Sequence, residues 1–247
     1  MFTRGVVMML MAGTLLMCRQ KEDVVLIACA ANLYPTVDSL LRQSRLEENS
    51  NYKIIYGSSG SLTNKILSGA PYDLFLSADE KYPEKIFDSG LACLPPRRYA
   101  TGQLVVWTAR DSIPMQDLGI RLVNMEKIAI ANPETAPYGR AAVEVLQALG
   151  IFDSLSQKLV FAQSIGQVNQ FVTSGAVDVG FTSLSSVSEG VGSWHLIDSA
   201  LYLPIYQKAI LIKDDGECNE AAILFYNFLF SDEARKIFEN FGYIVYE

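Results

Sequence analysis

The sequence predicts an α/β fold in two lobes with a ligand cleft between them. Strand patterns alternate with helix patterns along most of the chain, which is typical of sheets covered by helices. The proline-rich segment 94–98 interrupts this alternation, and a second alternating series begins after it. With 247 residues and 50% hydrophobic content, the chain is long enough for two cores of roughly 100 residues each.

The first series opens on a strand buried on both faces. Residues 24–30 form a continuous apolar run, the pattern of a strand inside a parallel sheet. Pro35 then begins a helical pattern that runs to about Glu48, since a proline in the first turn needs no N–H partner. The same alternation predicts strands at 52–56 and 73–77 and helices at 61–68 and 83–89.

The second series begins with the apolar run 104–108, which predicts another buried strand. Further strands are expected at 127–131, 158–161 and 177–182, with helices at 138–149 and 165–173. Successive strand-then-helix units build sheets that bind ligands where the carboxyl ends of strands meet the amino ends of helices.

The end of the chain is expected to return to the first lobe. A strand at 204–212 can make this crossing, and helices at 220–230 and 232–241 follow with no strand between them. We therefore expect both helices to pack on the first lobe. The predicted division is lobe 1 at 24–101 plus 217–247, and lobe 2 at 102–216.

The first residues have the pattern of a secretory signal. Arg4 precedes an apolar run, 5–17, that is shorter than the ~20 apolar residues of a membrane span. Cys18 closes the run as in a lipoprotein cleavage site, so 1–18 is expected to be a signal peptide with lipidation at Cys18. The alternative is cleavage nearby, with Cys18 lost or idle. Either way we expect an extracytoplasmic protein, periplasmic or lipid-anchored.

The net charge of −7 argues against nucleic acid or an anionic membrane surface as partner, because neither attracts a net anion. After Cys18, three cysteines remain, with no C-x-x-C spacing and so no zinc signal. Cys29 lies in an apolar strand and is expected to be a buried small hydrophobe. Cys93 and Cys218 either pair in an oxidising compartment or stay free.

Four predicted junctions between a loop and a helix share one character. Each follows a predicted strand, precedes a predicted helix and lacks Asp and Glu: 31–32, 58–61, 137–139 and 163–166. Such junctions present unpaired N–H groups beside the positive end of a helix dipole, which favours an anion. Two junctions come from each lobe, so together they could surround a small oxyanion with donors only.

Two other interpretations compete with anion binding. Ser or Asn before a helix is an ordinary N-cap, and the junction glycines can be ordinary turn residues. An enzyme is the second alternative, but His195 is the only histidine. The chain has no G-x-S-x-G, no phosphate-binding loop of the G-x-x-x-x-G-K type and no H-E-x-x-H. We therefore expect a protein that is not an enzyme.

Several segments are similar to motifs of one family of binding proteins: ACAANL at 28–33, GSSGS at 57–61, GAPYDLFLSAD at 69–79, NPETAPYG at 132–139 and SDEARKIF at 231–238. On these residues the chain resembles the molybdate-binding proteins of bacterial ABC transporters, within the type II periplasmic solute-binding proteins. The resemblance covers essentially everything after residue 23.

Carried over by position, the resemblance implies oxyanion contacts at Ala31 or Asn32, at Ser59, and at the N–H groups of Tyr138 and Ile165. Many members have Ser or Thr at the position of Ala31, so the Asn32 amide or N–H is expected to replace that hydroxyl. Some members have a ligand-contacting Tyr at the position of Ser183. They usually have a small residue where this chain has Tyr138, which puts a contact from Ser183 in doubt.

The implied function is capture of molybdate, with tungstate as a near-isosteric ligand, and delivery to a membrane permease. The resemblance implies no cofactor, and molybdenum would be held as its oxyanion without direct metal ligands; we expect a monomer. One alternative is a binding protein for another anion, such as sulfate, thiosulfate or phosphate. A hydrolase or transferase that uses His195 is the more distant alternative.

Overall fold

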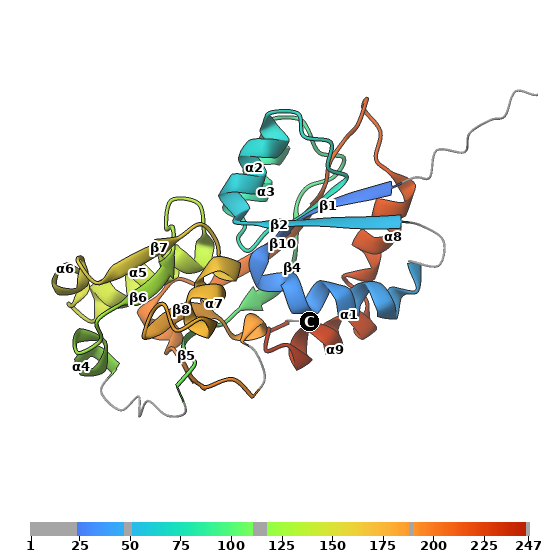
Figure 1. Cartoon of the computed structure of the whole chain (residues 1–247). Helices are drawn as coiled ribbons and strands as arrows, with labels where there is room; N and C mark the ends of the chain where they lie inside the picture. Colours follow the sequence, from blue (N-terminus) through green and yellow to red (C-terminus); the bar gives the residue numbers. More distant parts are fainter. Residues whose placement is uncertain (1–23, 47–50, 111–117, 188–189, 246–247) are drawn as a thin grey trace, which may run out of the picture.

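The computed structural model describes residues 24–46, 51–110, 118–187 and 190–245. The predicted signal peptide and the predicted lipidation at Cys18 lie outside the described residues. Within them, no helix is both long enough and apolar enough to cross a membrane. The fold is mixed α/β with two five-stranded sheets, which confirms the predicted fold class (Figure 1).

The first sheet has the strand order β2-β1-β3-β10-β4. Its members are β1 (Val24–Ala30), β2 (Asn51–Gly57), β3 (Leu74–Leu76), β4 (Arg97–Gly102) and β10 (Ile205–Leu211). β1 pairs in parallel with β2 and β3, whereas β10 runs antiparallel to β3 and β4. We call the half of the molecule built on this sheet lobe 1.

The second sheet has the order β7-β6-β8-β5-β9 and carries lobe 2. Its members are β5 (Leu104–Thr108), β6 (Ile128–Ala131), β7 (Leu159–Ala162), β8 (Val179–Ser183) and β9 (Ser193–Leu196). The chain passes from lobe 1 to lobe 2 between β4 and β5 and returns between β9 and β10. The predicted end of lobe 2 at residue 216 is therefore too late, because 205–211 already pairs within the first sheet.

Helices cover both sheets. Lobe 1 carries η1 (Ala31–Leu33), α1 (Tyr34–Ser44), α2 (Ser59–Leu67), α3 (Lys81–Asp88), α8 (Glu220–Phe228) and α9 (Asp232–Asn240). Lobe 2 carries α4 (Leu118–Val123), α5 (Pro137–Ala148), α6 (Phe152–Leu155), α7 (Ile165–Thr173), η3 (Leu184–Ser186) and η4 (Ser199–Leu201). As predicted, α8 and α9 pack on lobe 1, where their apolar side chains share a core with β1 and α1.

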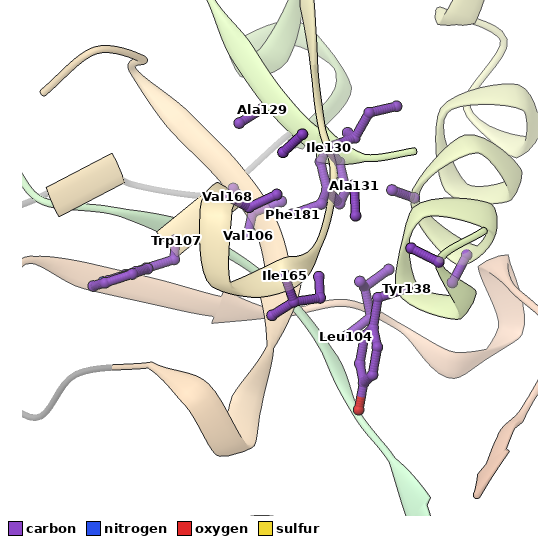
Figure 2. Close-up of a cluster of buried hydrophobic side chains, with 14 of the residues drawn as sticks. Leu104, Val106, Trp107, Ala129, Ile130, Ala131, Tyr138, Ile165, Val168 and Phe181 are labelled. Atoms are coloured by element: carbon purple, nitrogen blue, oxygen red, sulfur yellow. The ribbon is translucent and has the colours of Figure 1, made fainter. Parts of the chain in front are cut away.

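Each lobe has its own buried core, and the core of lobe 2 extends across the boundary. Leu104, Ile130, Phe181 and their neighbours fill lobe 2 (Figure 2). The same cluster includes Ala30, Ala31 and Ala78 from lobe 1, so small side chains of lobe 1 pack directly against lobe 2. The two lobes therefore meet in apolar contact at the ends of β1 and β3.

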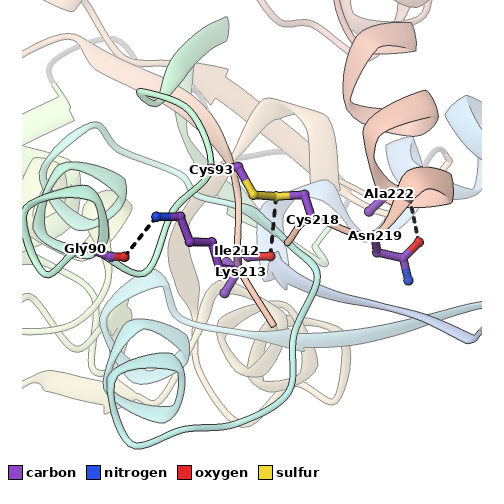
Figure 3. Close-up of a disulfide and its surroundings, with 7 residues drawn as sticks. All are labelled: Gly90, Cys93, Ile212, Lys213, Cys218, Asn219 and Ala222. Carbon is purple, nitrogen blue, oxygen red and sulfur yellow. Dashed lines mark hydrogen bonds between the residues drawn. A yellow bond between two sulfur atoms is a disulfide. The ribbon is translucent and has the colours of Figure 1, made fainter. Parts of the chain in front are cut away.

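Cys93 and Cys218 form a disulfide that joins the segment after α3 to the segment before α8 (Figure 3). Of the two alternatives that the sequence left open, the structure selects pairing. The bond spans 125 residues, so it removes many conformations from the unfolded chain. Cys29 is a free thiol inside β1, and burial raises its pKa well above the ordinary value, as expected for a small apolar core residue.

Replacing both Cys93 and Cys218 by serine is expected to lower the free energy of unfolding by about 2–5 kcal/mol, because the unfolded chain regains the conformational entropy that the disulfide removes. Urea denaturation followed by circular dichroism measures the change. Dithiothreitol is the matched control, since it should lower the denaturation midpoint of the wild type and leave that of the double variant in place. A variant as stable as the oxidised wild type would contradict a stabilising role.

Candidate functional site

A small cavity of about 10 Å³ lies where the two lobes meet. The residues lining it come from both lobes: Ala30, Ala31, Asn32, Gly57, Ser58, Ser59, Ala78, Ala136, Pro137, Tyr138 and Ile165. All of the predicted contact residues, Ala31, Asn32, Ser59, Tyr138 and Ile165, are among them. A cavity this small has no room for an extended organic ligand in this arrangement of the lobes.

Helices α2, α5 and α7 begin at the cavity. Ser59 and Ile165 are the first residues of α2 and α7, and Tyr138 is the second residue of α5. The first N–H groups of an α-helix have no partner inside the helix, and they carry the positive end of its dipole. The three helices therefore direct donors and partial positive charge at one point, from both lobes.

The residues that precede these helices make no capping hydrogen bond with their side chains. Ser58 and Ser164 are of a type that usually caps, yet neither side chain accepts from its helix. By contrast, the Ser231 side chain accepts from Ala234 at the start of α9. The interpretation of Ser58 and Ser164 as ordinary N-caps is therefore wrong, and the first N–H groups at the cavity, those of Ser59, Tyr138 and Ile165, are left for another acceptor.

Ser59 combines a helix N–H with a hydroxyl held in a fixed position. The side chain is fully buried, and its Oγ accepts a 3.0 Å hydrogen bond from the N–H of Ala78. Because that bond uses the oxygen as acceptor, the hydroxyl proton remains for donation. Ala78 follows β3, so this bond also ties the start of α2 to the end of a central strand.

Asn32 lines the cavity, but its side-chain amide is already used. Both of its N–H groups donate within the protein, to Oε1 of Gln207 and to the Tyr243 hydroxyl, each at 3.0 Å. The expectation that the Asn32 amide replaces a hydroxyl missing at Ala31 is therefore wrong for the side chain. The remaining donors of this junction are the backbone N–H groups of η1.

The cavity contains no fixed charge, because none of the described residues that line it is Lys, Arg, Asp or Glu. The adjacent residues Asp79 and Arg140 follow Ala78 and Gly139 and form an ion pair with each other across the lobes. Burial raises the pKa of Asp79 above its ordinary value, and the Arg140 guanidinium opposes this shift. Because the pair is neutral as a whole, it adds no net charge beside the cavity.

Hydrogen bonds close the rim of the cavity on the side of α2 and α3. The N–H of Gly60 donates to the carbonyl of Thr135 at 2.8 Å, and the Tyr82 hydroxyl donates to the carbonyl of Glu134 at 2.9 Å. Both donors belong to lobe 1 and both acceptors to lobe 2. The 132–136 loop is therefore held against the start of α2, beside the cavity.

Two residues considered from the sequence lie away from the cavity. His195 is exposed on β9, an edge strand paired with β5. Ser183 is buried, but its hydroxyl bonds to those of Ser185 and Ser186, and it does not line the cavity. Among the described residues no group of three or more His, Cys, Asp or Glu is arranged to hold a metal ion.

Ala78 and Gln207 also contribute to the site, although the sequence did not indicate either residue. Ala78 lies in the segment 69–79, which is similar to a family motif, but alanine has no polar side chain that would indicate a role. Gln207 lies within a strand. It could have been recognised as a polar residue in a largely apolar run, 205–211. Its side chain is fully buried behind the cavity, where it bonds to Asn32 and Tyr138.

Two α/β lobes that enclose a small, uncharged cavity lined by hydrogen-bond donors define a binding protein for a small solute. Comparison with known proteins agrees with this class. The chain belongs to the family of bacterial extracellular solute-binding proteins, which it matches over residues 25–244.

Among its relatives is the molybdate-binding protein ModA of Rhodobacter capsulatus, which is 38% identical over 227 residues, 89% of this chain and 88% of the relative. ModA of Azotobacter vinelandii is 35% identical over 238 residues, 93% of each chain. The solved structure of the Azotobacter vinelandii periplasmic molybdate-binding protein superposes with a TM-score of 0.83. It is 34% identical and covers 90% of this chain and 100% of its own.

Proposed function

We propose that this chain captures molybdate outside the cytoplasm and delivers it to the membrane permease of an ABC transporter. The observation that carries the proposal is the convergence of three helix N-termini, none capped by a side chain, on one uncharged cavity. Two relatives at 38% and 35% identity carry the name molybdate-binding protein, which supports the same cargo.

The donor set favours a fully deprotonated tetrahedral oxyanion. Such an anion only accepts hydrogen bonds, and the cavity offers helix N–H groups and the hydroxyl of Ser59. Each helix end stabilises a negative charge by about 0.3–1 kcal/mol, and by up to about 2 kcal/mol where it is partly buried. Phosphate is disfavoured, because its proton at neutral pH needs an acceptor and no carboxylate lines the cavity.

Tungstate is nearly isosteric with molybdate, so the same donors should hold it. Sulfate and thiosulfate are the remaining anionic alternatives, and sulfate is smaller than a cage built for molybdate.

We further propose that the chain acts as a monomer without a cofactor and is not an enzyme. Tyr138 is the one titratable side chain among the described residues lining the cavity, and burial raises its pKa well above the ordinary value.

A thermal-shift series with molybdate, tungstate, sulfate, thiosulfate, phosphate and chloride tests the cargo. A ligand at 100 times its dissociation constant should add about 2.7 kcal/mol to the free energy of unfolding. We expect large shifts with molybdate and tungstate and small ones with the other anions. A shift with sulfate and none with molybdate would overturn the assignment.

Replacing Ser59 by alanine is expected to weaken molybdate binding by about tenfold to 100-fold, the range for losing one hydrogen bond to a charged ligand. The substitution also leaves the N–H of Ala78 without its acceptor. Isothermal titration calorimetry measures the dissociation constant.

Replacing His195 by alanine is the control for this experiment, since His195 is exposed on β9 and does not line the cavity. We expect wild-type affinity. Loss of binding in the His195 variant with retention in the Ser59 variant would favour the enzyme alternative instead.

The family of the protein and the proposed N-terminal processing support a location outside the cytoplasm. We propose a periplasmic or lipid-anchored protein whose lipid is attached at Cys18. Mass spectrometry of the native N-terminus distinguishes a lipid-modified Cys18 from cleavage nearby. Either outcome is compatible with capture of molybdate, because the cavity is built from residues beyond position 29.

A further inference from the structure

Tyr138 reaches from the cavity to the place where the chain crosses between the lobes. Its backbone lies at the start of α5, and the whole residue is 1% exposed. Figure 2 shows the hydroxyl pointing away from the other labelled side chains. That hydroxyl accepts a 3.0 Å hydrogen bond from Nε2 of Gln207 on β10. Tyr138 belongs to lobe 2 and β10 to lobe 1, so this bond connects the lobes.

Gln207 also holds the donor junction of lobe 1. Its side chain is fully buried, and its Oε1 accepts from Nδ2 of Asn32 at 3.0 Å and from the Tyr99 hydroxyl at 2.9 Å. One amide therefore links a cavity-lining residue of each lobe, Asn32 and Tyr138. A buried polar network whose members are all hydrogen-bonded rigidifies the surrounding structure.

The local backbone is shaped around this link. The pairing of β10 with β4 shifts register between Gln207 and Lys208 and leaves Tyr99 as an extra residue on β4. Such bulges redirect side chains and are common beside functional sites. At Gly102, a Cβ would clash with the Tyr138 hydroxyl and lie 2.5 Å from Nε2 of Gln207. Gly102 is the last residue of β4, so the link lies directly at the crossing into lobe 2.

We propose that Gln207 is a positioning residue that sets the spacing between the donors of the two lobes, and so selects tetrahedral anions by size. This inference rests on the proposed function and adds a determinant of its selectivity. An anion of another size could be held equally well only if the spacing between the lobes changed. Because Gln207 ties both Asn32 and Tyr138, such a movement would strain or break a buried hydrogen bond.

The test compares the dissociation constants of molybdate and sulfate for the wild type and for Tyr138→Phe, measured by calorimetry at one ionic strength. Removing the hydroxyl breaks the link between the lobes and keeps the ring. We expect the preference for molybdate over sulfate to fall about tenfold, the size of one typical hydrogen bond. Gln207→Met removes the same link from the other side and should lower the preference in the same direction.

Tyr99→Phe is the matched control. It removes a phenol hydroxyl that is equally buried and that bonds to the same Gln207 side chain. Its partners, Gln207 and the carbonyl of Ser77, all lie in lobe 1, and Tyr99 does not line the cavity. We expect Tyr99→Phe to lower the free energy of unfolding and to leave the ratio of the two dissociation constants within about twofold, since no bond between the lobes is lost.

The outcomes separate the two proposals. A wild type that does not prefer molybdate overturns the proposed function. A wild type that prefers molybdate, with Tyr138→Phe and Gln207→Met keeping its full preference, overturns the positioning role of Gln207 alone. The positioning role is also overturned if Tyr99→Phe lowers the preference for molybdate as much as Tyr138→Phe does. It is overturned as well if neither Tyr138→Phe nor Gln207→Met folds. Either result would mean that the role of Gln207 is structural.

Discussion

Replacing Gly60 by alanine is expected to weaken molybdate binding by at least about 100-fold while each lobe stays folded. A Cβ at this position would lie 2.5 Å from the Tyr82 hydroxyl oxygen and 2.9 Å from Cα of Thr135. Thr135 belongs to lobe 2, so its backbone can yield only if the lobes separate. Overpacking of this kind costs about 1–3 kcal/mol, and each hydrogen bond lost adds about 0.5–1.5 kcal/mol.

The bonds at risk are those that close the rim of the cavity. The N–H of Gly60 donates to the carbonyl of Thr135, and the Tyr82 hydroxyl donates to that of Glu134. Calorimetry with molybdate gives the affinity, and small-angle X-ray scattering reports whether the lobes stand further apart. Gly119→Ala in α4 is the control, because a Cβ there meets no atom within 4 Å. A Gly60 variant with wild-type affinity would show that this rim contact does not matter for capture.

Replacing Gly139 by alanine is expected to lower the free energy of unfolding by about 3 kcal/mol or more and to abolish molybdate binding. A Cβ here would clash with the carbonyl oxygen of Ala131 and lie 2.7 Å from the carbonyl carbon of the same residue. Both atoms belong to the end of β6, which is held by its pairing with β7. No side chain can move aside, so α5 would have to shift, and the Tyr138 N–H would move with it.

Gly166→Ala is the matched control for Gly139, since Gly166 also lies in the first turn of a helix at the junction of the lobes. A Cβ there would meet Oγ of Ser164 at 3.7 Å and Cβ of Ala31 at 3.8 Å, which are ordinary contacts. Urea denaturation of both variants measures the difference in stability. If the Gly139 variant proves as stable as the Gly166 variant, the close approach of α5 to β6 does not constrain the site.

Periodicity predicted most of the fold because most strands are buried on both faces. The runs 24–30 and 104–108 are apolar throughout, and both form strands within those limits. The segments β4 and β9 escaped prediction since each lies at the edge of a sheet and carries polar residues. In β4 the exposed guanidinium of Arg97 stacks on Phe230 and that of Arg98 on Tyr206, so the arginines that seemed to mark a break belong to a strand.

The candidate site was predictable where it depends on local sequence. A donor-rich loop before a helix can be recognised from residues such as 58–61, although α2 begins at Ser59 and not at the predicted residue 61. The Ser59-Gly60 pair resembled a turn because glycine and serine lack strong helix preference. Its conformation is stabilised instead by contacts with Ala78 and with Thr135 in the other lobe.

Long-range contacts could not be predicted from one sequence. The Asn32 amide bonds to Gln207 and Tyr243, which are 175 and 211 residues away, and this pairing removes the side chain from the list of ligand donors. The sequence left Gly139 as part of a donor junction or as an ordinary turn residue, whereas in the structure it allows close approach of α5 to β6. In both cases the contacting residue lies on another helix or strand, so no local sequence pattern indicates the contact.

A crystal structure of the protein with molybdate would show whether uncharged donors from both lobes hold the anion. The account predicts molybdate in the cavity between the lobes, with its oxygens at about 2.7–3.2 Å from the N–H groups of Tyr138 and Ile165 and from Ser59. A molybdate held by lysine or arginine side chains, or bound outside this cavity, would contradict it.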